Sequence, residues 1–188
     1  MAQDELSLVE IERTLQQADL LHSEAAINLA IARLAQDITQ ALAQTNPLLL
    51  TVMNGGLVFA GNLLPRLNFP LQTDFIHATR YGDATTGGTL HWLARPSVPL
   101  AGRHVLILDD ILDQGHTLLA LLDDCRAQGA SCVQCAVLVE KQHSRKADPN
   151  YRADFVGLSV EDRFVFGYGM DYRGYWRNAP GIYAVAGS

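Results

Sequence analysis

The sequence predicts an α/β fold in which helices flank a mostly parallel central sheet. Short apolar runs of strand length alternate along the chain with longer segments whose apolar residues recur every three or four positions. This alternation is typical of a parallel sheet covered by helices on both faces. A chain of 188 residues is also long enough to bury a full hydrophobic core, so we expect a single domain over residues 1–188.

The predicted strands are mostly short apolar runs, and residues 90–93 are expected to form a strand that returns from the glycine-rich loop before them. The predicted strands are residues 48–53, 71–79, 90–93, 104–108 and 131–139. The first of them is apolar almost throughout, which is typical of a strand buried on both faces. A loop is expected over residues 109–115, between the fourth strand and the helix that follows it.

The predicted helices begin and end at residues with recognisable signals. Ser23 is a candidate N-cap for a first helix, whose apolar residues recur at helical spacing up to Leu42. Pro65 bends or ends a second helix over residues 57–67. A third, amphipathic helix covers residues 116–127 and ends before Gly129.

Charge and composition narrow the classes of function. The formal net charge of −6 argues against non-specific nucleic-acid binding, which needs a basic face to neutralise phosphates. No run reaches the roughly 18 apolar residues of a membrane span, and the acidic first ten residues do not resemble a secretory signal. Three cysteines, an odd number, do not predict a disulfide framework. We therefore expect a cytoplasmic protein without nucleic-acid or membrane partners.

Two of the cysteines, Cys132 and Cys135, form a C-x-x-C pair, a spacing that also occurs in metal and redox sites. The pair lies in the predicted strand over residues 131–139. Because residues three apart on a strand point to opposite faces of the sheet, the two sulfurs are expected to be separate.

The segment over residues 105–117 carries the strongest functional pattern. Its strand delivers Asp109 and Asp110 to the carboxyl edge of the sheet, where ligands bind in folds of this kind. Asp113 follows, just before the helix that begins near His116. A helix N-terminus offers unpaired N–H groups that suit a phosphate, and carboxylates suit the vicinal hydroxyls of a ribose. The pattern therefore predicts a ribose 5-phosphate site, against the alternative that Asp113 only caps the helix.

The same thirteen residues resemble the phosphoribosyl pyrophosphate (PRPP) signature of the type I phosphoribosyltransferases. From about Ser23 to the end, the chain is similar to the hypoxanthine-guanine phosphoribosyltransferases of that family. The similar segments are residues 52–56, 80–83, 105–117, 139–141, 154–157 and 164–172. The resemblance implies the type I fold, with a PRPP-binding core over about residues 24–140. It also implies a small base-binding hood built from about residues 1–22 and 150–188.

The resemblance implies transfer of the phosphoribosyl group of PRPP to hypoxanthine or guanine, with Mg²⁺ as cofactor. Asp113 would exchange a proton at N7 of the base while the bond forms at N9. Asp109 and Asp110 would bind the ribose hydroxyls. The backbone of the four residues after Asp113, with the hydroxyl of the last of them, would hold the 5-phosphate. These residues are Gln114, Gly115, His116 and Thr117.

Further roles follow for the base and the metal. Lys141 would donate to O6 of the base, which selects 6-oxopurines over adenine because adenine carries an amino group there. Phe164 would stack on the purine, and the Val165 backbone would read its edge. Asp171 would hold a Mg²⁺ ion, largely through water, and Asp109 is the other candidate metal ligand.

Pyrophosphate would be bound by Asn54, Gly55 and Arg177. Many relatives place a basic residue where Asn54 stands, and the loop often contains a non-proline cis peptide bond. Asn54 removes a positive charge from the loop but leaves its backbone N–H groups. The glycine-rich segment over residues 81–89 is expected to be a mobile lid that excludes water, and Arg80 and Tyr81 would move with it.

Three other interpretations stay open. The protein could be a related transferase with another base preference, xanthine-guanine or hypoxanthine alone. It could also be a regulatory protein that keeps the PRPP fold to sense nucleotides and bind RNA, or a structural subunit. Asp113, Lys141 and the net charge of −6 favour the enzyme. We expect it to be a homodimer or a homotetramer.

Overall fold

The computed structural model describes residues 7–80 and 90–188. The predicted lid, including Tyr81, lies outside the described residues. Within the described part of the chain, no helix combines the length and the apolar character that crossing a membrane requires.

A six-stranded sheet forms the centre of the molecule, in the order β4-β3-β2-β5-β6-β7. Its strands are β2 (Leu48–Val52), β3 (Gln72–Arg80), β4 (Leu90–Ala94), β5 (His104–Leu112), β6 (Cys132–Lys141) and β7 (Phe155–Val160). All neighbouring pairs are parallel except β3 and β4. This confirms the predicted mostly parallel sheet.

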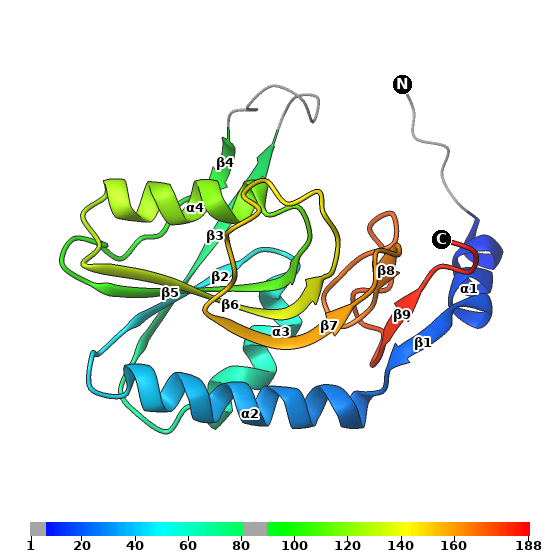
Figure 1. The fold of residues 1–188 in the computed structure, drawn as a ribbon, viewed down its shortest axis with the longest axis horizontal. Helices are drawn as coiled ribbons and strands as arrows, with labels where there is room; N and C mark the ends of the chain where they lie inside the picture. Colours follow the sequence, from blue (N-terminus) through cyan, green and yellow to red (C-terminus); the bar gives the residue numbers. More distant parts are fainter. Residues whose placement is uncertain (1–6, 81–89) are drawn as a thin grey trace.

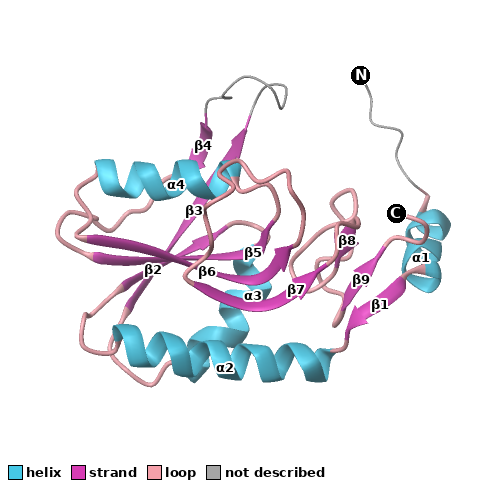
Figure 2. Ribbon diagram, in the orientation of Figure 1, coloured by secondary structure: helices cyan, strands magenta, loops and turns pink. Residues whose placement is uncertain are grey.

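Helices cover both faces of this sheet, as Figures 1 and 2 show, with α4 on one face and α2 and α3 on the other. The helices are α1 (Leu8–Gln17), α2 (Glu24–Leu42), α3 (Gly56–Leu63), the 3₁₀ turn η1 (Leu64–Arg66) and α4 (His116–Ala127). The Ser23 side chain accepts a hydrogen bond from the Ala26 N–H, which confirms the predicted N-cap. Pro65 lies in the 3₁₀ turn, so the second helix ends there as predicted.

Two hydrophobic cores explain why the central strands are apolar along most of their length. In β2, Leu49 packs against the core beneath α2 and α3, whereas Leu48 and Leu50 pack against the core beneath α4. In β5, Leu106 packs against the core beneath α2 and α3, and Ile107 packs against the core beneath α4. Alternate side chains of a strand point to opposite faces, so a strand covered on both sides needs apolar residues throughout.

The strand before the acid pair is longer than predicted. β5 continues to Leu112, so Asp109 and Asp110 lie on the strand and not in a loop. The reason is its partner, because β6 pairs with β5 out to the match between Leu112 and Glu140. The connecting loop is only three residues long, and the acids are fixed by the sheet itself.

A second, small antiparallel sheet has the order β1-β9-β8 and lies beside the core. Its strands are β1 (Asp19–His22), β8 (Val165–Phe166) and β9 (Ile182–Ala184). The helix α1 begins at a capping box formed by Ser7 and Glu10, and the Trp176 indole N–H donates to the Ile11 carbonyl at 2.7 Å. Both ends of the described chain therefore meet here. The predicted hood range included residues 150–188, but β7 within it belongs to the large sheet.

The cysteines are all free. Cys135 is buried in the core beneath α4, where its sulfur lies 2.8 Å from the Tyr151 hydroxyl. Burial raises the pKa of the Cys135 thiol to about 11, so this cysteine is an inert core residue. Cys132 lies at the start of the same strand and is only partly buried.

Candidate functional site

A cleft of about 370 Å³ lies at the carboxyl ends of β2, β5 and β6. The C-terminal segment over residues 164–177 closes one side of it. Ten of the predicted site residues line the cleft: Asn54, Gly55, Asp109, Asp110, Asp113, Lys141, Phe164, Val165, Asp171 and Arg177. The topology therefore brings together residues that are more than 120 positions apart in the sequence, from Asn54 to Arg177.

The acid pair lies on the floor of the cleft. Asp110 is buried, with 8% of its surface exposed, and its N–H donates to the Asp109 carboxylate at 2.9 Å. Burial, followed by the charge of Asp110, raises the pKa of Asp109 well above its usual value. Burial raises the pKa of Asp110 as well. A ligand that offers positive charge or hydroxyl donors would offset the free-energy cost of ionising these buried carboxyls.

The Asn54 loop packs tightly against these acids. A Cβ atom on Gly55 would lie 2.2 Å from the Asp110 Oδ2 atom, so only glycine fits at this position. The peptide bond between Met53 and Asn54 is cis. Gly169, at φ +108°, also packs against this loop, and a Cβ atom on it would lie 2.2 Å from the Gly55 carbonyl oxygen.

We expect Gly169→Ala to destabilise the protein. The left-handed backbone alone costs a side chain about 1–3 kcal/mol, and the clash with the Gly55 carbonyl adds to that. Gly174→Ala is the matched control, because Gly174 also has a positive φ but faces open space. Urea unfolding should give a clearly lower free energy of unfolding for Gly169→Ala than for the control. Equal losses in the two variants would contradict the close approach.

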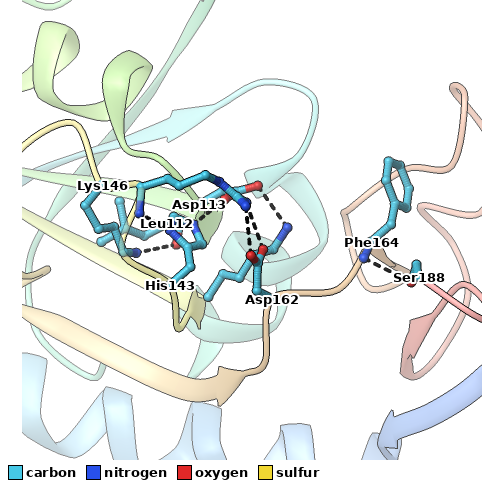
Figure 3. Close-up of polar contacts among 9 residues, drawn as sticks. Leu112, Asp113, His143, Lys146, Asp162, Phe164 and Ser188 are labelled. Carbon is cyan, nitrogen blue, oxygen red and sulfur yellow. Dashed lines mark hydrogen bonds and ion pairs between the residues drawn. The ribbon is translucent and has the colours of Figure 1, made fainter.

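Asp113 forms the centre of a polar cluster beside the acids (Figure 3). Lys141 donates to Asp113 Oδ2 at 2.9 Å, and His143 Nε2 lies 2.6 Å from Asp113 Oδ1. Burial opposes ionisation of Asp113, but the hydrogen bonds from Lys141 and His143 outweigh it and lower the pKa of the carboxyl. Asp113 is therefore an ionised acceptor at neutral pH.

The predicted phosphate cradle lies at the start of α4. Gly115 is the N-cap of this helix with φ +87°, a conformation that favours glycine. The first N–H groups of a helix lack intrahelical partners and point outward. Gln114, Gly115, His116 and Thr117 do not line the cleft itself but directly follow Asp113, which does.

The C-terminal segment contributes a charged pair and an aromatic ring. Arg177 forms an ion pair with Asp171 at 2.6 Å and donates to the Gly169 carbonyl at 2.7 Å. The Phe164 ring is 49% exposed and is held edge-to-face against Tyr172, at 5.8 Å between centroids. A flat ligand could stack on the free face of Phe164.

Sequence reasoning missed the residues behind Asp113. His143 and Lys146 follow β6, and Glu140 lies within it, next to Lys141. Lys146 lies 3.5 Å from Glu140 and donates to the Leu112 carbonyl at 3.0 Å. The available signal was a run of basic residues directly after a buried strand. Only the fold shows that this run packs against the loop at Asp113.

Together these features define an α/β protein whose cleft is lined by an acid pair and an exposed aromatic ring, with the N-terminus of α4 directly after the lining residue Asp113. The chain belongs to the phosphoribosyltransferase family, because the model of the phosphoribosyl transferase domain matches residues 17–173.

Individual relatives agree with this assignment. The chain is 35% identical over 164 residues to a hypoxanthine-guanine phosphoribosyltransferase from Bacillus subtilis, covering 87% of this chain and 90% of the relative. A hypoxanthine-guanine-xanthine phosphoribosyltransferase from Tritrichomonas foetus is 31% identical over 87% of this chain and 88% of its own length. A crystal structure of a hypoxanthine phosphoribosyltransferase from Staphylococcus aureus superposes with a TM-score of 0.86. It is 26% identical, covering 95% of this chain and 96% of that chain.

Proposed function

We propose that this protein transfers the 5-phosphoribosyl group of PRPP to a 6-oxopurine, hypoxanthine or guanine. The products are IMP or GMP and pyrophosphate, as in purine salvage. The observation that carries the proposal is the pair formed by Asp113 and Lys141 at 2.9 Å inside the cleft. The pair combines a proton acceptor, Asp113, with a hydrogen-bond donor, Lys141. A 6-oxopurine needs these two groups side by side, because its N7 and O6 atoms lie on the same edge of the ring.

The PRPP molecule would lie along the edge formed by β5 and α4. Asp109 and Asp110 would accept hydrogen bonds from the ribose hydroxyls. The helix N-terminus over residues 114–117 would bind the 5-phosphate through backbone N–H groups. Asn54 and Gly55 would bind pyrophosphate through their backbone, and Arg177 would add positive charge from the opposite side of the cleft.

The base would lie between Phe164 and the residues at the end of β6. Lys141 would leave Asp113 to donate to O6, while the Val165 backbone reads the edge of the ring. As N9 forms its bond to C1 of the ribose, the bond from C1 to pyrophosphate breaks and its electron pair leaves with pyrophosphate. Asp113 would accept the N7 proton, so the product base is neutral.

The donor set of the cleft fits a hard cation such as Mg²⁺. Four aspartate carboxylates line the cleft, and carboxylate oxygens are ligands that Mg²⁺ prefers. Asp109 and Asp171 are the residues that would hold the metal, Asp171 largely through water. Within residues 7–80 and 90–188, no group of three histidine, cysteine or acidic side chains is placed to hold a metal ion. Mg²⁺ commonly takes few protein ligands and completes its shell with substrate oxygens, and it would neutralise charge on the pyrophosphate.

The decisive assay measures nucleotide formation from PRPP with hypoxanthine, guanine, xanthine or adenine, in Mg²⁺ and in EDTA. We expect IMP and GMP in Mg²⁺, little product from adenine and none in EDTA. A xanthine product would extend the specificity in the direction of the Tritrichomonas foetus relative, whose name includes xanthine. If no base yields a nucleotide in the presence of PRPP and Mg²⁺, the proposed function is wrong.

A further inference from the structure

His143 contacts Asp113 from behind the cleft. Its Nε2 atom lies 2.6 Å from Asp113 Oδ1, and only 3% of its side chain is exposed. The Asp113 side chain is 42% exposed and lines the cleft, which His143 does not. His143 therefore touches the carboxylate from the side that a ligand in the cleft cannot reach.

A second hydrogen bond fixes which nitrogen of His143 carries the proton. The Arg145 backbone N–H donates to His143 Nδ1 at 3.0 Å, so Nδ1 must be the acceptor. A neutral imidazole with an accepting Nδ1 carries its hydrogen on Nε2. His143 is thus oriented as a hydrogen-bond donor to Asp113 Oδ1.

The segment that carries His143 also holds the backbone on both sides of Asp113, and Figure 3 shows the contact on the Leu112 side. Lys146 donates to the Leu112 carbonyl at 3.0 Å, and the Ala147 N–H donates to the Gln114 carbonyl at 2.8 Å. One short segment after β6 therefore binds three consecutive residues, Leu112 at the end of β5 and the two loop residues that follow it. The Lys146 side chain is 9% exposed and lies 3.5 Å from Glu140, so this attachment is buried.

The two oxygens of Asp113 consequently have different partners. Lys141 lines the cleft and binds Oδ2, whereas His143 lies behind the carboxylate and binds Oδ1. A ligand that attracts Lys141 would release Oδ2 and leave Oδ1 bound. Without His143, the carboxylate would lose its remaining side-chain partner at that moment and rotate freely.

We propose that His143 is a positioning residue that anchors Asp113 through Oδ1, so that Oδ2 faces the base when Lys141 moves to O6. The proposal rests on the proposed function. His143 does not touch the substrate. It acts through Asp113, whose Oδ2 accepts the N7 proton.

The test compares His143→Leu with His143→Gln in the full chain. Leucine removes the donor, and the Arg145 N–H that it frees is on an exposed residue and can bind water. We expect kcat with hypoxanthine to fall about ten- to a hundredfold, the size of effect that misplacing a catalytic group produces, with KM for PRPP unchanged. His143→Gln keeps an N–H donor and should recover most of kcat.

The pH profile separates positioning from a structural role. The ionisable groups around Asp113 are Lys141, His143 and, farther back, Lys146 with its partner Glu140. Hydrogen bonds to the ionised carboxyl lower its pKa, so removing one should shift the acid limb of kcat in His143→Leu to higher pH. In an Asp113→Asn background, His143→Leu should cause little further loss, because the two residues act as one unit.

His104→Leu is the matched control, because it makes the same change at the opposite end of β5. It should keep wild-type kcat and the wild-type pH profile. If wild type forms IMP but His143→Leu retains at least half of its kcat with an unshifted acid limb, the anchor is overturned. If wild type forms no nucleotide at all, the proposed function fails instead, and the two failures are distinguishable.

Discussion

Asp113→Asn should lower kcat by about 10²–10⁴-fold, the usual contribution of a positioned general base. The amide keeps an oxygen that can accept a hydrogen bond from Lys141, but it cannot take a proton from N7. PRPP should therefore still bind, because the residues proposed to bind ribose and phosphate are unchanged. Steady-state kinetics and calorimetric titration with PRPP measure the two effects separately.

The pH dependence gives a second check of Asp113. Lys141 and His143 lower its pKa, so wild-type activity should persist down to acidic pH and be lost as the pH falls through that lowered pKa. Asp113→Asn should lack this acid limb. Asp162→Asn is the control, because Asp162 forms an exposed ion pair with Arg145 and lies outside the cleft lining. Turnover by Asp113→Asn close to that of the control would remove Asp113 from proton transfer.

Lys141→Met should weaken the preference for hypoxanthine over adenine by about ten- to a hundredfold. This range corresponds to roughly 1–3 kcal/mol, the cost of leaving a buried donor unpaired. In wild type that cost falls on adenine, which offers no acceptor at C6, and methionine removes it. The Lys141 side chain is only 10% exposed, so water cannot easily replace the missing partner. The measurement is the ratio of kcat/KM for the two bases.

Lys141→Arg serves as the matched variant, since it keeps a cationic donor at the same place. It should keep the preference better than Lys141→Met. We expect Lys141→Met to lose kcat as well as discrimination between the bases, because Lys141 also binds Asp113. An unchanged ratio of kcat/KM in Lys141→Met would mean that another group reads O6.

Local signals in the sequence predicted several elements closely. Ser23 caps α2 as expected because N-capping depends on a side chain and an N–H only three residues away. The helix over residues 116–127 has the predicted bounds, because the spacing of its apolar residues and the glycine at position 129 are signals within or next to the helix. The capping box of Ser7 and Glu10 is an equally local signal, which the sequence contains and the prediction did not use.

The site was predictable only as far as its residues share one motif or one edge of the sheet. Asp109, Asp110 and Asp113 lie in one pattern, and the parallel fold places Lys141 at the same edge. The pattern itself indicated that Asp109 and Asp110 suit a ribose, whereas the roles of Asp113 and Lys141 came from the resemblance to a family. The distances between these residues came from neither, because a distance depends on register and packing.

The sequence by itself determined the alternation of strands and helices, the apolar faces of both cores and the cluster of acids at one strand end. These depend on propensity and periodicity, which act between near neighbours. Only the tertiary structure decided that β5 continues through the acid pair, since that extension requires its partner β6. It also decided that His143 meets Asp113 across thirty residues, and that Arg177 lies at the same cleft as Asn54. Such contacts arise when distant segments pack together, and no local pattern specifies them.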